Sequence, residues 1–204
     1  MKEADRVAGV AMIAAAAGAL LAMGHHPSGA HGGSALAGIV HASMIALLGL
    51  LIFGFTHMAR RRGLDRPAVL AGLLAYGIAL FGHVGAATIN GFVVPALAAR
   101  GVTAHDLFLF AWEMNQALAK LGVYATSAAY LFWSAELIGE GRTRLLGALG
   151  LVAAILPASL LASGAIRLDV TGAFISYAVQ VGWAALVGLH LLRHGALAPE
   201  RRAD

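Results

Sequence analysis

Apolar residues fill six long stretches of this chain, and short polar segments separate them. The stretches lie near residues 7–23, 35–58, 68–90, 106–135, 145–164 and 172–193. Each is close to the roughly 20 residues that a helix needs to cross a hydrocarbon core of about 30 Å. The pattern predicts an all-α protein in which a single domain, residues 1–204, forms a bundle of six transmembrane helices in contact with the lipid bilayer.

Polar segments and helix-breaking residues mark several of the boundaries. The segment RRRGLDRP closes the second helix and places Pro67 in the first turn of the third, where proline is favoured. Asn90 and Gly91, followed by Pro95, predict that the third helix ends or breaks there. The segment GFVVPALAARG would then lie along the membrane interface.

The amino-acid composition supports a membrane protein and excludes some chemistry. Hydrophobic residues make up 60% of the chain and charged residues 12%, about half of the roughly 25% found in soluble domains. The chain has no cysteine, so it forms no disulfide, no cysteine-ligated iron–sulfur cluster and no thiol nucleophile.

The first apolar stretch has the length of a signal peptide, but its flanks differ from one. Glu3 and Asp5 lie in what would be the positively charged region. His25 and His26 stand where a small-residue cleavage motif belongs. We expect this segment to be retained as a helix.

The basic residues are distributed unevenly between the two sides of the predicted membrane. With both termini inside, the cytoplasmic side holds eleven: Lys2, Arg6, Arg60, Arg61, Arg62, Arg66, Arg142, Arg144, Arg193, Arg201 and Arg202. The other side holds only Arg100 and Arg167. This asymmetry predicts cytoplasmic termini and a multi-pass protein of the bacterial inner (plasma) membrane. It also explains the net charge of +4, so no nucleic-acid partner is expected.

Two tryptophans provide a scale of depth for the fourth predicted helix. Trp112 and Trp133 are 21 residues apart, or about 31 Å along an α-helix, which matches one hydrocarbon thickness. If they are the outer and inner aromatic anchors, Glu113 lies at the outer interface. Lys120 then lies about 12 Å below Trp112.

Polar residues form a stripe on this same helix. Glu113, Gln116 and Lys120 share one helix face because they are spaced by three, four and seven positions. Asn115 points elsewhere. A charge in the hydrocarbon core is costly unless it is paired or hydrated, so we expect the stripe to face the bundle interior.

Other helices carry polar residues at a similar predicted depth. They are His41 on the second helix, His83 and Asn90 on the third, and Gln180 on the sixth. Together with the stripe they predict a polar cavity that opens to the outer face. The alternative is that each side chain is satisfied by a local hydrogen bond and serves packing only.

Histidines are concentrated in the first outer loop, GHHPSGAHGGS. His25, His26 and His31 lie there, and His41 follows ten residues later. Imidazole suits Cu(II), Zn(II) and Ni(II), so these residues and His83 are candidate metal ligands. Their spacing matches no established zinc motif, and a hydrated turn with incidental histidines is the alternative.

The expected function is binding of a metal, a haem or a small ligand in this cavity. Lys120, Gln116, Glu113, Asn90 and Gln180 are the candidate ligand contacts. A b-type haem would be held by one histidine from each of two helices, His41 and His83.

Three other functions remain open from the sequence. A proton-linked small-solute transporter would use Glu113, Lys120 and the histidines as a relay. A membrane-embedded metal-dependent enzyme would use His41, His83 and Glu113, although the chain has no HExxH or GxSxG motif. The third is a non-catalytic assembly subunit, and a homo-oligomer is compatible with all of these.

Overall fold

The computed structural model describes residues 3–26 and 35–194, which are helical except for short connections. The helices are α1 (Glu3–Gly24), α2 (Ala35–Arg62), α3 (Pro67–Thr88), α4 (Val94–Ala99), α5 (His105–Ile138), α6 (Arg144–Ala162) and α7 (Val170–His194), and a π-helical segment η2 (Ile89–Val93) joins α3 to α4. No strand occurs in the described residues. The all-α prediction is confirmed, and each of the six predicted stretches coincides with a helix.

Five of these helices are long and apolar enough to cross a membrane. They are Glu3–Gly24, Leu36–Arg62, Pro67–Ala99, Arg144–Ala162 and Val170–Arg193. The remaining long helix, α5, has the greatest length, 34 residues, and is not among these five. The chain therefore has the make-up of a multi-pass membrane protein.

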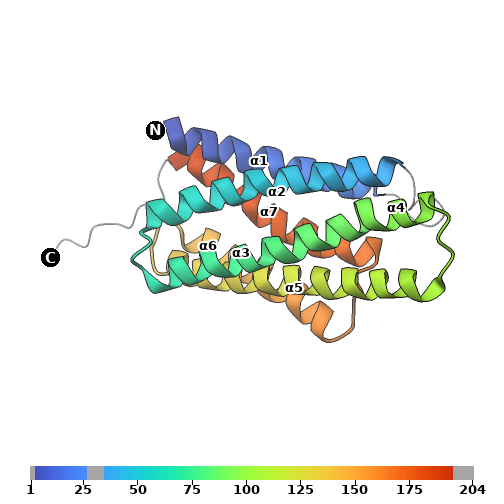
Figure 1. The fold of residues 1–204 in the computed structure, drawn as a ribbon. Coiled ribbons are helices and arrows are strands. Elements are labelled where there is room, and N and C mark those ends of the chain that lie inside the picture. The colour runs from blue at the N-terminus through green and yellow to red at the C-terminus, as the bar shows by residue number, and fades with distance from the viewer. Residues whose placement is uncertain (1–2, 27–34, 195–204) are drawn as a thin grey trace.

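The helices run roughly side by side in one bundle (Figure 1). α1 packs along α2 and α7, while α3 packs along α5 in the most extensive helix pair. The first half of α1 packs against the second half of α7, where Gly9 lies against the carbonyl oxygen of Gly188. Both ends of the described chain thus lie at one end of the bundle, which we call the terminal end (Figure 1).

The third helix does not end at Asn90, contrary to the sequence prediction. α3 passes through η2 into α4, so one helical rod runs over Pro67–Ala99. Pro95 has no N–H to donate to the carbonyl four residues earlier. The rod widens locally, and the N–H of Val94 bonds the carbonyl of Ile89 five residues back. The proline thus produces a π turn rather than a break.

Five aromatic side chains fill the bundle core near the terminal end: Phe55, Tyr76, Tyr130, Trp133 and Trp183. Their neighbouring ring centroids are 4.3–6.3 Å apart. Trp133 is 1% exposed, and its indole N–H donates to the carbonyl of Val69 at 3.2 Å. The proposed role of Trp133 as an interfacial anchor is therefore wrong, and the depth scale based on it does not hold.

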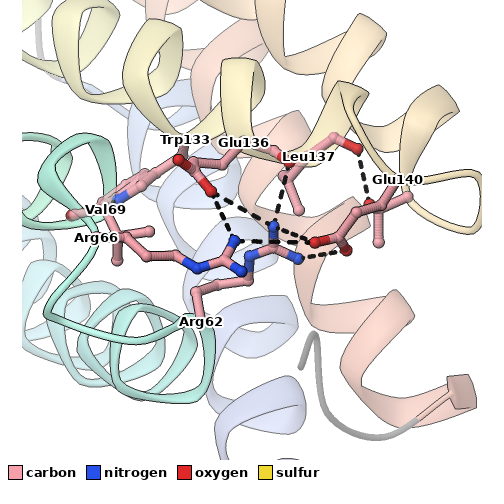
Figure 2. A network of polar contacts seen from close by, with 8 residues as sticks. Arg62, Arg66, Val69, Trp133, Glu136, Leu137 and Glu140 are labelled. Atoms are coloured by element: carbon pink, nitrogen blue, oxygen red, sulfur yellow. Dashed lines mark hydrogen bonds and ion pairs between the residues drawn. The ribbon is translucent and has the colours of Figure 1, made fainter. Parts of the chain in front are cut away.

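Ion pairs bind the turn between α2 and α3 to the end of α5 (Figure 2). Arg62 is buried and donates to both carboxylate oxygens of Glu140, at 2.8 and 2.9 Å. Arg66 donates to the carboxylate of Glu136 at 2.8 Å. Removing one partner of a buried pair leaves an uncompensated charge, so these contacts hold the α2–α3 turn in place.

Glycines allow α3 and α5 to approach backbone to backbone. A Cβ added to Gly82 would lie 2.6 Å from both the amide nitrogen of Gly122 and the carbonyl oxygen of Leu118. A Cβ added to Gly122 would overlap the imidazole ring of His83. Close contact through small residues is a principal means by which membrane helices associate.

Gly82→Ala is expected to destabilise the protein by about 1–3 kcal/mol, the usual cost of overpacking. Gly77→Ala is the matched control on the same helix, because an added Cβ there meets nothing within 4 Å. The control should leave the Tm unchanged or slightly higher, since alanine is the better helix former. Thermal unfolding in detergent, followed by circular dichroism, compares the two; equal Tm values would contradict the close contact.

Candidate functional site

A cavity of about 530 Å³ lies in the half of the bundle opposite the terminal end. Its walls come from the end of α1, the start of α2, the end of α3 with η2, and the starts of α5 and α7. Most of the lining side chains are apolar. The polar ones are His26, His41, His83, Asn90, Asn115, Gln116, Asp169 and Tyr177. We call this space the distal cavity.

His41 lies on the wall of the distal cavity, on α2. It is 4% exposed, and its Nδ1 lies 2.7 Å from the carbonyl oxygen of Ala37, one turn earlier. Its Nε2 lies 3.2 Å from Nε2 of His26. Gly91 in the π turn passes directly against the Cβ of His41, so α2 and η2 approach closely at this point.

His83 lies deeper, on α3, between two hydroxyl groups. Its Nδ1 is 2.7 Å from the hydroxyl of Tyr177, and its Nε2 is 3.1 Å from the hydroxyl of Thr126. Both ring nitrogens are therefore engaged within the protein. A haem ligand needs one ring nitrogen free for iron, so this arrangement disfavours haem ligation by His41 and His83 together.

Three amide side chains line the same cavity. Asn115 donates to the carbonyl of Ala86 at 2.9 Å, and Gln116 donates to the carbonyl of Leu168 at 3.0 Å. These bonds orient both side chains through their NH₂ groups, and in the described part of the chain their amide oxygens accept no hydrogen bond. Asn90 also faces the cavity, from the π turn. The cavity wall thus offers hydrogen-bond acceptors to a ligand.

The charged members of the predicted stripe do not face the bundle interior. Glu113 and Lys120 are exposed and do not line the distal cavity, whereas Asn115 is buried. The prediction that Glu113 and Lys120 face the bundle interior is therefore wrong, and Asn115 faces the interior instead. The reason is packing, because α5 turns its small residues, including Gly122, toward α3. Asn115 precedes Gly122 by seven residues, or two helical turns, so it lies on the same inward face.

Gln180 is buried on α7 but lies outside the distal cavity. Its side-chain NH₂ lies 3.2 Å from the carbonyl of Val123 and 3.3 Å from the hydroxyl of Ser127. The side chain therefore links α7 to α5. Its own backbone carbonyl accepts a hydrogen bond from Tyr130 at 3.0 Å.

The remaining loop histidines stand apart from this site. His25 is exposed, and its Nδ1 lies 2.8 Å from the carbonyl of Leu21. His31 lies outside the described residues. Across residues 3–26 and 35–194, no three His, Cys, Asp or Glu side chains are grouped as ligands for one metal ion. The predicted histidines are thus not assembled into a single ligand set in the described part of the chain.

Three polar residues of the cavity wall were not predicted as site residues: Asn115, Asp169 and Tyr177. Tyr177 could have been found, because it precedes Gln180 by three positions and so shares its helix face. Asp169 precedes α7, and its carboxylate accepts a hydrogen bond from the N–H of Gly172 at 2.8 Å. Asp169 reaches the cavity only through the packing of the helices, so no local sequence pattern predicts its position.

The distal cavity suits an uncharged ligand better than an ion-pairing one. Within the described residues, no lysine, arginine, serine or threonine lines it, and Asp169 is its one acidic residue. It therefore offers neither a permanent cation for an anionic group nor a hydroxyl nucleophile of serine or threonine. It offers apolar walls, imidazoles, amides and a phenol.

Comparison with known proteins identifies no relative. The chain matches no protein-family model, no curated protein and no solved structure.

Tyr177→Phe is expected to lower the stability of the protein by about 1–3 kcal/mol, because Nδ1 of buried His83 loses its partner. Tyr124→Phe is the matched control on α5: Tyr124 is 40% exposed, and its hydroxyl makes no hydrogen bond within the described residues. Tm values measured in the same detergent separate the two. A Tyr177→Phe protein as stable as the control would refute the structural importance of this bond.

Proposed function

We propose that this chain is a six-span protein of the bacterial inner membrane that binds an uncharged amphiphilic molecule in the distal cavity. The observation that carries the proposal is a cavity in which apolar walls and hydrogen-bonding groups from five helical segments meet. Its volume of about 530 Å³ falls within the roughly 300–1,000 Å³ typical of small-molecule sites.

The distribution of basic residues supports cytoplasmic termini. Among the described residues, the terminal end carries Arg6, Arg60, Arg61, Arg62, Arg66, Arg142, Arg144 and Arg193. The opposite end carries Arg100 and Arg167. Because basic residues are retained on the cytoplasmic side, this distribution supports a position of the distal cavity in the outer half of the membrane, with α5 as the sixth span of the proposed topology.

Single cysteines test this topology, because the natural chain has none. Thr103→Cys and Gly141→Cys are a matched pair of exposed positions at opposite ends of the bundle. We expect a membrane-impermeant maleimide to label Thr103→Cys on intact cells and Gly141→Cys only after permeabilisation. The reverse pattern would invert the protein and place the cavity on the cytoplasmic side.

The chemistry of the cavity wall favours a ligand with a polar, uncharged head. The amide oxygens of Asn115 and Gln116 are available as acceptors, and Trp112 and Phe108 provide aromatic walls beside them. Toward the terminal end, the aromatic cluster around Phe55 packs the bundle core tightly. A closed inner half supports a binding protein more than an open transport path.

Quenching of tryptophan fluorescence by brominated amphiphiles tests this binding. Of the three tryptophans, Trp112 lines the cavity, while Trp133 and Trp183 are buried in the core. We expect bromodecanol to quench fluorescence saturably, and bromodecanoate or bromodecane to give only the linear quenching caused by probe dissolved in the lipid. The saturable part should vanish in Trp112→Phe.

A cavity-filling variant provides the control for this measurement. Ala119 lines the cavity, whereas Ala117, two residues away on α5, is exposed. Ala119→Phe should abolish saturable quenching and Ala117→Phe should retain it. Saturable quenching that survives in Ala119→Phe, or that is equal for all three probes, would refute a site for uncharged amphiphiles in the cavity.

A further inference from the structure

We infer that His26 and His41 form a copper-binding site at the wall of the distal cavity. This goes beyond the organic ligand proposed above. The two imidazoles come from different parts of the chain, His41 from α2 and His26 from the turn that follows α1. They meet through their Nε2 atoms at 3.2 Å.

The hydrogen bond of His41 fixes which of its nitrogens can bind a metal. A carbonyl oxygen only accepts hydrogen bonds, so Nδ1, 2.7 Å from the oxygen of Ala37, carries the ring proton. In the neutral imidazole Nε2 is then unprotonated and accepts the hydrogen bond from Nε2–H of His26. When a metal ion replaces this hydrogen bond, His26 binds as its other neutral tautomer, with the ring proton on Nδ1. A histidine that donates its other N–H to a backbone carbonyl is the usual form of a metal ligand.

The distance between the two imidazoles suits a shared ion. Two metal–nitrogen bonds of about 2.0–2.1 Å at a near-tetrahedral angle hold their nitrogens about 3.1–3.4 Å apart, which includes the observed 3.2 Å. The ring centroids are only 4.8 Å apart, and the ring planes are inclined by 76°. The rings are therefore not aligned end to end, and their Nε2 atoms approach at an angle.

Two methionines favour copper among the metals that imidazole binds. Met44 follows His41 by three residues on α2, which places the two side chains side by side. Met23 lies in the last turn of α1, and its carbonyl accepts a hydrogen bond from the N–H of His26 at 3.1 Å. Both methionines line the distal cavity. Thioethers select Cu(I), and imidazole accepts both copper oxidation states, so two histidines with one or two methionines suit copper better than zinc.

Copper titration of the purified, chelator-stripped protein tests the site. One Cu²⁺ per chain is expected, with an electron paramagnetic resonance spectrum that shows coupling to two imidazole nitrogens. His26→Ala or His41→Ala should weaken Cu²⁺ binding by at least about tenfold, since loss of even an outer-shell partner of a ligating histidine costs roughly 10- to 100-fold. His26 is partly exposed in a turn, so its variant tests the site without depending on a buried substitution.

The matched control is the double variant His25→Ala/His31→Ala, which removes two histidines of the same segment and keeps the pair. It should bind Cu²⁺ with unchanged affinity. Loss of binding in this control, or wild-type affinity in both His26→Ala and His41→Ala, would overturn the site and leave the contact as a hydrogen bond between two imidazoles.

A second pair of variants tests the choice of metal. Met44→Leu should weaken Cu⁺ binding, measured by competition with a Cu⁺ chelator under reducing conditions, and Met114→Leu should not, because Met114 is exposed and lies outside the cavity lining. Equal Cu⁺ affinities for these two variants would overturn the assignment to copper. The bromodecanol experiment is run with chelator present, so failure of the organic ligand and failure of the metal site are separate results.

Discussion

Gly82 of α3 lies against the backbone of α5 at Leu118 and Gly122, with no side chain between the two helices. The position of His83 follows from this contact, because its ring occupies the space that a side chain at residue 122 would fill. The contact also selects which face of α5 turns inward, and so brings Asn115 to the cavity wall. An approach through glycine relies on close packing rather than on the hydrophobic effect, as expected for helices surrounded by lipid.

The two ends of the bundle use their polar residues differently. At the terminal end, Arg62 and Arg66 are matched by Glu136 and Glu140 in a closed network of ion pairs (Figure 2). At the other end, polar groups surround a cavity, and several acceptors on its wall have no partner among the described residues. Satisfied polar groups serve stability, whereas acceptors without a partner beside a cavity are suited to binding a ligand.

The distal cavity brings together several residues that the sequence predicted at a similar depth in the membrane. His41, His83, Asn90 and Gln116 were expected near one level of the membrane, and all four line it. Their angular positions were less predictable. Glu113 and Lys120 were expected to face inward and are exposed, and Gln180 bonds to α5 outside the cavity. Depth follows from counting residues along a helix, but the direction of a side chain depends on the neighbours of that helix.

By itself, the sequence determined the helical segments, their approximate ends and the polar residues among them, because length and hydropathy are properties of each segment alone. Only the tertiary structure decided which face of each helix turns inward, that Pro95 widens a continuous rod instead of ending it, and that His26 meets His41. The physical reason is that lipid and protein core are both apolar, so hydrophobicity hardly distinguishes the two sides of a membrane helix. The inward face is chosen by small residues and by hydrogen-bond partners on other helices, and these are known only when the helices are packed together.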